Sequence, residues 1–144
     1  MGKIKFSRQR ESIREYVKSR CDHPTADMVY REMRKIYPSI SLGTVYRNLT
    51  FLADRGELVK LSLGEESERF DGNVSPHYHF KCDRCGKVSD IEMPWMTHID
   101  VLASSKYDGE VRGHVAWFYG ICSECRNLKK MIKFLFKIDN YSYY

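Results

Sequence analysis

Two cysteine pairs carry the clearest chemistry of this 144-residue chain, Cys82 with Cys85 and Cys122 with Cys125. Thiolates at the first and fourth positions of a tight turn suit Zn2+, and two such turns supply the four ligands of a closed structural zinc site. The segment between the pairs, residues 86–121, is long and must fold as its own element to bring them together. The alternatives are a redox dithiol or two buried thiol pairs. A redox motif needs only one pair, usually beside a βαβ pattern that is missing here.

Imidazoles and carboxylates gather around the first cysteine pair. His77 and His79 are two residues apart, so in a strand both rings lie on one face and can bind one ion. Asp71 and Asp90 flank them along the chain. Because nitrogen and carboxylate donors together suit Fe2+, Mn2+ or a similar ion, the sequence predicts a second metal site that differs chemically from the first.

The remaining donor residues have simpler interpretations. We expect His98 to be an exposed polar residue and His114 to pack or form hydrogen bonds within a strand. His23 lies far away in the sequence and fits a residue that caps or covers the second helix. Cys21, the fifth cysteine, is expected to be a small buried thiol before Pro24.

Composition and charge limit the class of protein. The chain is 42% hydrophobic, which is enough for one ordinary domain or two small ones. It has no segment of membrane-spanning length and no signal peptide, so we expect a cytoplasmic protein with reduced, metal-binding thiols and no membrane partner. The net charge is +5, and residues 1–70 carry 14 Lys and Arg against 10 Asp and Glu. This bias is compatible with nucleic-acid binding, but a solvated helix face explains it equally well.

Three helices are predicted in the first half of the chain. Ser7, Thr25 and Ser41 can each cap a helix, and apolar residues recur behind each of them at helical spacing. The first helix should end near Ser19 and the third at Gly56. The residues expected to face the core are Ile13, Tyr16 and Val17, then Val29, Met33 and Ile36, then Val45, Leu49 and Leu52.

A β-hairpin should follow these helices, with strands over 58–63 and 67–71 around a turn at 64–66. Three helices plus such a wing form a winged helix-turn-helix, whose last helix enters the major groove of DNA. Each outward residue of that helix is either a base or phosphate contact or simply an exposed polar residue. The candidates for DNA contacts are Ser41, Thr44, Tyr46 and Arg47.

The second half of the chain is predicted to be different in kind. We expect strands over 79–82, 88–92 and 110–121 and a helix over 95–106. Residues 126–144 should form an amphipathic helical tail that covers a dimer partner or the unit's own sheet. The predicted fold class is α+β, with an amino-terminal winged helix-turn-helix DNA-binding domain over 1–72 and a carboxy-terminal α+β metal-binding dimerisation domain over 73–144.

With these residues in view, the chain resembles the ferric-uptake-regulator (Fur) superfamily of bacterial metal-dependent repressors over nearly its whole length. It is most similar to the peroxide-response (PerR) branch, in which three histidines and two aspartates bind the regulatory ion. Asp90 distinguishes this branch, because iron sensors typically carry Glu there. The motifs, in the family's order, are His23-Pro-Thr-Ala-Asp27, Thr44-Val-Tyr-Arg-Asn-Leu49, Arg69-Phe-Asp71, His77-Tyr-His79-Phe-Lys-Cys82-Asp-Arg-Cys85-Gly and Tyr119-Gly-Ile-Cys122-Ser-Glu-Cys125. The ligands that the resemblance implies are His23, Asp71, His77, His79 and Asp90.

The resemblance implies a homodimeric repressor of double-stranded operator DNA and not an enzyme. Zn2+ would be structural and Fe2+ or Mn2+ regulatory, and peroxide would oxidise the histidines that match His23 and His77 when Fe2+ is bound. One ion held by both halves of the chain would fix their angle. In a dimer, that angle sets the spacing of the two recognition helices.

Two features depart from the family's usual patterns, one from the iron-sensing members and one, at Arg47, from those peroxide sensors that carry Asn there. The additional metal site of the iron sensors would use residues matching 76, 78, 97 and 114, of which only His114 binds metal strongly, so we expect that site to be absent. Arg47 matches the iron sensors, so the operator sequence stays open. The alternatives are an iron-responsive repressor of metal uptake without peroxide chemistry, an architectural DNA-binding protein with purely structural metals, and a zinc hydrolase. Apart from peroxide as a signal, no small-molecule substrate is expected.

Overall fold

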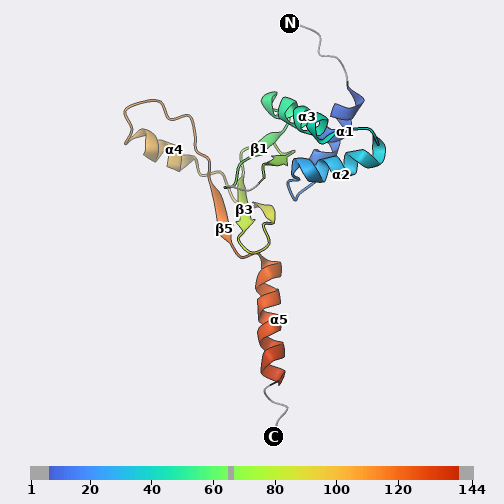
Figure 1. Cartoon of the computed structure of the whole chain (residues 1–144). Helices are drawn as coiled ribbons and strands as arrows, with labels where there is room; N and C mark the ends of the chain where they lie inside the picture. Colours follow the sequence, from blue (N-terminus) through green and yellow to red (C-terminus); the bar gives the residue numbers. More distant parts are fainter. Residues whose placement is uncertain (1–6, 65–66, 140–144) are drawn as a thin grey trace. The chain divides into compact units, whose positions relative to one another are not determined.

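The computed structural model describes residues 7–64 and 67–139 and divides into two compact units (Figure 1). Unit 1 is Met1–Pro76 and unit 2 is His77–Tyr144. Among the helices of the described residues, none has the length and apolar character that crossing a membrane requires.

Unit 1 begins with three capped helices, α1 (Arg8–Lys18), α2 (Ala26–Ile36) and α3 (Leu42–Asp54). The predicted caps are confirmed: the side chains of Ser7, Thr25 and Ser41 each accept a hydrogen bond from a backbone N–H in the first turn. Such a bond satisfies one of the N–H groups that a helix start leaves without a partner. After α3, Gly56 has a φ of 70°, the left-handed conformation that commonly ends a helix.

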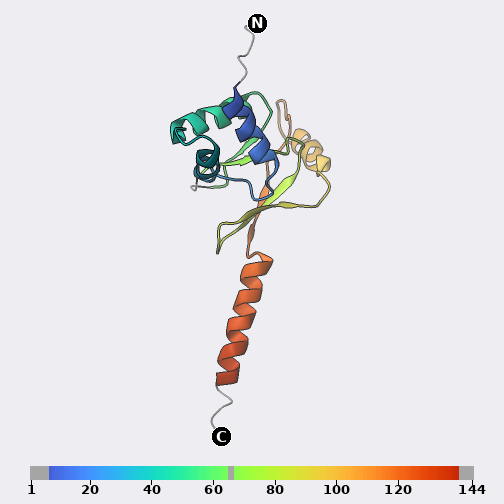
Figure 2. The same cartoon turned by 90° about the vertical axis from the view of Figure 1, so that its right-hand side faces the viewer.

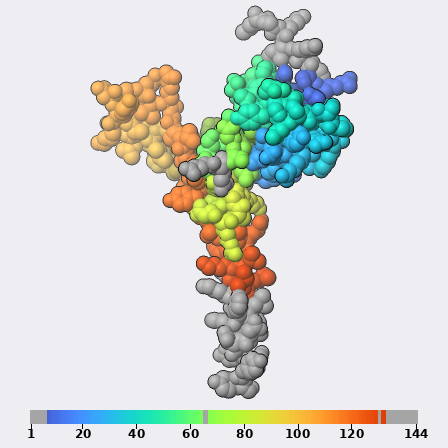
Figure 3. All heavy atoms as spheres, viewed as in Figure 1, coloured from blue at the N-terminus to red at the C-terminus, as the bar shows by residue number. Residues whose placement is uncertain are grey.

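The apolar faces of these helices meet in one core, and the atoms of the three helices form the blue to blue-green part of Figure 3. The prediction for Ile36 is wrong, because this last residue of α2 is 60% exposed. The chain turns after Tyr37, and Ile40 enters the core instead. The buried core residues are Ile13, Val17, Val29, Met33, Ile40, Val45, Leu49, Leu52, Leu58 and Phe70.

The wing of unit 1 is a short antiparallel hairpin of β1 (Val59–Leu61) and β2 (Arg69–Asp71). Both strands are shorter than predicted, and residues 65 and 66 of the expected turn lie outside the described residues. An isolated bridge between Thr25 and Arg69 joins β2 to the residues that precede α2.

Unit 2 contains a three-stranded sheet in the order β4-β3-β5. The central strand β3 (Tyr78–Cys82) is antiparallel to β4 (Val88–Ile91) and parallel to β5 (Trp117–Gly120). The predicted strand over 110–121 is wrong for its first part, because β3 is short and its pairing with β5 begins only at Trp117. Helix α4 (Thr97–Ser104) lies within its predicted range.

The last helix, α5 (Ser123–Asp139), begins at the second cysteine pair and runs away from the sheet of unit 2 in both Figure 1 and Figure 2. Leu128 and Met131 are 48% and 61% exposed, so these residues do not cover the sheet. The prediction that the tail covers a dimer partner stays a prediction. Residues 140–144 of the predicted tail lie outside the described residues.

The core of unit 1 yields a stability prediction. Leu49 is fully buried on α3, the helix that packs against both α1 and α2. Leu49→Ala should lower the free energy of unfolding by about 2 to 5 kcal/mol, since it removes buried carbons and leaves a cavity. Leu42→Ala on the same helix, at a residue that is 41% exposed, should cost less than about 1 kcal/mol. Urea unfolding followed by circular dichroism measures both, and equal losses would contradict this core assignment.

Candidate metal centres

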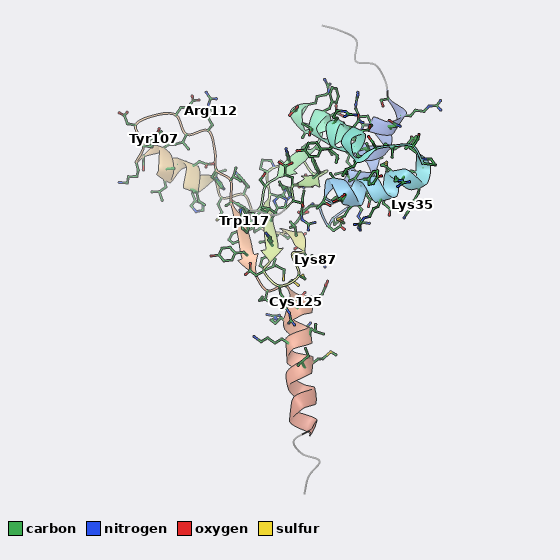
Figure 4. The ribbon with its side chains drawn as sticks, viewed as in Figure 1. Lys35, Lys87, Tyr107, Arg112, Trp117 and Cys125 are labelled. Carbon is green, nitrogen blue, oxygen red and sulfur yellow. The ribbon has the colours of Figure 1, made fainter. Side chains whose placement is uncertain are left out.

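The parallel pairing of β3 with β5 brings the two cysteine pairs together. Cys82 ends β3 and pairs with Gly120, the last residue of β5. Parallel strands have their carboxyl ends at the same edge of a sheet, so the turn after β3 and the start of α5 both lie at that edge. Figure 4 shows Cys125 at the start of α5. Glu124, which is also on α5, forms an ion pair with Lys87 of the turn after β3, with 2.5 Å between Lys87 Nζ and Glu124 Oε1.

The four sulfur atoms form one cluster. Each lies within 4.8 Å of the others, and the Sγ atoms of Cys85 and Cys122 are 3.8 Å apart. A tetrahedral site with Zn–S bonds of about 2.3 Å places its sulfurs roughly 3.8 Å apart. The spacing therefore fits zinc, and a single cluster of four is more than a redox dithiol needs. Its members are Cys82, Cys85, Cys122 and Cys125.

The backbone prepares this cluster for negative charge. The N–H of Cys122 donates to the Cys82 sulfur at 3.4 Å, and that bond, with others from the Cys85 and Arg84 N–H groups, lowers the pKa of Cys82 to about 6. Burial, followed by the neighbouring thiols, raises the pKa of Cys125 to about 12. Without a cation the cluster therefore resists full ionisation, whereas a divalent ion would stabilise four thiolates.

A second donor group lies on the other strand pair of unit 2. In the β3–β4 register His79 is directly opposite Asp90. The Nε2 atoms of His77 and His79 are 3.2 and 3.6 Å from the same Asp90 carboxylate oxygen, and the two rings are 4.4 Å apart. The predicted convergence of the two imidazoles is confirmed. Their role as ligands stays a prediction.

Tyr78 anchors the strand that carries these histidines. Side chains alternate along a strand, so Tyr78 lies on the face opposite to His77 and His79. It is fully buried, its ring stacks on Trp95, and its hydroxyl bonds the Nε2 atom of His114 at 2.7 Å. This packing fixes the direction in which the two histidines point.

The remaining predicted ligands, His23 and Asp71, lie near each other in unit 1. Residues 25 and 69 form the bridge between the two segments, the Phe70 N–H donates to the Pro24 carbonyl, and Arg69 donates to the His23 carbonyl at 3.0 Å. His23 has a backbone φ of 48°, in the left-handed region that residues other than glycine adopt uncommonly. Its Nδ1 is 3.7 Å from the Asp71 carboxylate. Tertiary structure thus places this distant histidine beside the aspartate.

The other cysteine and histidines differ in part from expectation. Cys21 is exposed, so the prediction of a buried thiol is wrong. His98 is exposed, as predicted. His114 precedes β5 and is not in a strand, but it packs on Trp95 and hydrogen-bonds Asp100 at 2.7 Å. The Nε2 atom of His114 is 2.7 Å from the Tyr78 hydroxyl, and the expected absence of an additional metal site stays a prediction.

The four predicted DNA contacts lie at the start of α3, and each of them forms a side-chain hydrogen bond within unit 1. The Ser41 and Thr44 hydroxyls are 2.9 Å apart, and Arg47 donates to Thr44 at 3.1 Å. The Tyr46 hydroxyl donates to Glu68 at 2.8 Å. Our sequence reasoning missed Glu68 and its partner Lys60, because a wing residue's contact with a helix leaves no local signal.

Residues 2–119 match the sequence model of the Ferric uptake regulator family. The chain is 39% identical over 124 residues to the peroxide-responsive repressor PerR of Staphylococcus aureus strain Mu50, a match that covers 86% of this chain and 84% of that protein.

Solved structures give a consistent result. The Campylobacter jejuni peroxide stress regulator has a TM-score of 0.67 at 28% identity, over 81% of this chain and 88% of that one. The Helicobacter pylori ferric uptake regulator Fur has a TM-score of 0.74 at 23% identity, over 85% of this chain and 83% of that one. These neighbours confirm the predicted α+β fold class.

The sulfur cluster leads to a test with a matched control. Cys85→Ser removes one of four thiolates, so the purified protein should lose its zinc, and unit 2 should lose its cooperative unfolding because structural zinc contributes on the order of 10 kcal/mol. Cys21→Ser changes an exposed cysteine in unit 1 and should keep one zinc per chain. Metal analysis after gel filtration measures both. A zinc-free Cys85→Ser protein that is folded and dimeric would show that the cluster is not a structural zinc site.

Proposed function

The chain belongs to the Ferric uptake regulator family, and on this premise we propose that it is a metal-dependent transcriptional repressor that senses peroxide. The observation that carries the proposal is the meeting of His77 and His79 at the Asp90 carboxylate. Identity of 39% to a peroxide-responsive repressor supports the peroxide branch over plain metal sensing.

Operator DNA is the proposed partner of unit 1. Its three helices and wing form the arrangement in which the last helix enters the major groove. The start of α3 presents Thr44, Tyr46 and Arg47 there, and its Ser41 cap leaves further backbone N–H groups for a phosphate. Unit 2 is the proposed dimerisation unit. A symmetric dimer would place two recognition helices about 34 to 36 Å apart, on successive turns of DNA.

The regulatory ion would take its ligands from both units. His23 and Asp71 would come from unit 1, and His77, His79 and Asp90 from unit 2. Three neutral imidazoles and two carboxylates are the donors that Fe2+ and Mn2+ accept, whereas the four thiolates suit Zn2+. A reducing compartment such as the cytoplasm would keep those thiols available.

Ligands on two units explain how metal can control DNA binding. Each donor group is held by its own unit, so binding one ion would favour the arrangement in which the two groups meet. A coupling free energy of about 1 to 3 kcal/mol would change DNA affinity roughly 5- to 150-fold.

Peroxide sensing depends on which metal is bound. When bound by these ligands, Fe2+ supplies the redox chemistry that activates peroxide, and Mn2+ does not. His23 and His77 are the rings proposed to be oxidised, because they match the histidines that peroxide oxidises in the peroxide-response branch of the family. In the net reaction a ring carbon gains one peroxide oxygen, the second oxygen leaves as water, and the imidazole supplies both electrons. A ring altered in this way is a poorer ligand, so the units would separate and DNA would be released.

Ligand substitutions test metal control. His77→Ala and Asp90→Ala should keep the zinc and the dimer but lose the roughly 5- to 150-fold stimulation of operator binding by Mn2+. His98→Ala, at an exposed histidine on α4, should keep full stimulation. Fluorescence anisotropy with an operator selected from random DNA measures all three. Unchanged stimulation in either ligand variant would remove that residue from the regulatory site.

Peptide mapping after peroxide treatment tests the sensing chemistry. The Fe2+ protein should gain one oxygen, 16 mass units, on the peptide with His23 or His77 and lose operator binding, because oxidation occurs at the ligands themselves. The Mn2+ protein is the control and should gain none there. Oxygen found only on sulfur, or equal sensitivity of the Mn2+ form, would leave an iron-responsive repressor without peroxide chemistry or a thiol-based sensor.

A further inference from the structure

A charged cluster joins the recognition helix to the wing of unit 1. Lys60 on β1 places its Nζ 2.8 Å from Oε1 of Glu68, the residue just before β2. The Tyr46 hydroxyl, on α3, donates to Oε2 of the same carboxylate at 2.8 Å. Lys60 Nζ is also 3.4 Å from the Tyr46 hydroxyl and 5.6 Å from the centre of its ring. One carboxylate thus binds two groups that a DNA backbone would otherwise attract.

The cluster is charged and open to solvent at neutral pH. Hydrogen bonds from Lys60 and then Tyr46 lower the pKa of Glu68, and the bond with Glu68 raises the pKa of Lys60. The side chains of Lys60 and Glu68 are 32% and 36% exposed, and Tyr46 is 41% exposed. A phosphate can therefore reach this surface, but Lys60 is already ion-paired there and the Glu68 carboxylate repels the phosphate.

Tyr46 has room to leave this position. Its ring lines a groove of about 480 Å3 between the starts of α2 and α3 and the wing, together with Leu42, Gly43 and Glu68. The bond to Glu68 is thus one of the contacts that hold the ring beside the wing. Without it, the ring would have more orientations, and ordering it on DNA would cost conformational entropy.

We propose that Glu68 sets the sequence discrimination of unit 1. Its carboxylate occupies Lys60, which lowers affinity for any DNA backbone, and it fixes Tyr46, which keeps the ring oriented for the operator. The inference rests on the proposed DNA-binding function and names a positioning residue for it. The physical basis is that sequence-independent binding comes from Lys and Arg on phosphates, whereas discrimination comes from correctly placed side chains at base edges.

The first test is Glu68→Gln in the full, zinc-loaded chain. Glutamine loses the charge that holds Lys60, and it also weakens the hold on Tyr46, because a neutral oxygen accepts a weaker hydrogen bond than a carboxylate does. At 0.1 M salt, affinity for random-sequence DNA should rise roughly 8-fold, because one freed lysine adds one phosphate contact. The plot of log affinity against log salt should steepen by about 1. Operator affinity should rise less, because the less firmly held Tyr46 offsets part of the gain there, so the ratio of operator to random affinity should fall.

Two further variants make the result specific. Glu57→Gln removes another acid of unit 1, one that is ion-paired with Arg14 and Arg55 after the far end of α3, and it should leave the salt slope unchanged. Lys60→Met combined with Glu68→Gln should cancel the gain in random affinity. Circular dichroism and zinc content confirm that each variant is folded.

Three results would contradict the proposed role of Glu68. A similar effect of Glu57→Gln, equal gains on operator and random DNA, or a gain that survives Lys60→Met would each overturn the role of Glu68. If selection from random DNA enriches no operator, the repressor proposal fails instead. In that case the slope of log affinity against log salt for random-sequence DNA still shows whether Glu68 holds Lys60 away from phosphates.

Discussion

The pairing of β3 with both of its neighbours is the constraint on which the chemistry of unit 2 depends. On one side the antiparallel register sets His79 opposite Asp90. On the other, the parallel register sets Cys82 beside Gly120, from which the chain continues into the second cysteine pair. A shift of one residue would turn His77 and His79 away from Asp90, because side chains alternate along a strand. The buried ring of Tyr78 on the opposite face resists that shift.

In unit 1 a backbone bridge, and not a strand register, brings two distant donor residues together. His23 and Asp71 are far apart in sequence, and the bridge between Thr25 and Arg69 brings their segments together. Arg69 also donates to the carbonyls of Asp22 and His23, which holds the turn where His23 takes its left-handed conformation. Backbone bonds and an arginine therefore fix this pair of donors before any ion binds. Each unit prepares its own share of the proposed regulatory site.

The two sets of donors suit different tasks. The four sulfurs lie within one unit, at an edge where backbone N–H groups favour the thiolate of Cys82. A closed site of this kind stabilises a fold and has no open position for a signal. The imidazole and carboxylate donors are divided between the two units. The affinity for an ion bound by all of them would therefore depend on how the two units are arranged. The soft thiolate ligands favour Zn2+, whereas the imidazole and carboxylate ligands favour Fe2+ or Mn2+. The zinc ligands lie within one unit and suit a structural role, and the ligands divided between two units suit a regulatory one.

Sequence alone determined the local features, and tertiary structure decided which distant residues meet. Ser7, Thr25 and Ser41 were predictable as caps because a cap acts within one turn of its own helix. The spacing of His77 and His79, and that of the cysteines within each pair, was likewise readable, since strand alternation and tight turns are local. The exposure of Cys21 and Ile36, the short β5 and the contact of Glu68 with Tyr46 were not readable, because they depend on which segments pack together. Even the match of the motifs to a known family named His23 without explaining its place, and only the bridge to β2 gives the physical reason.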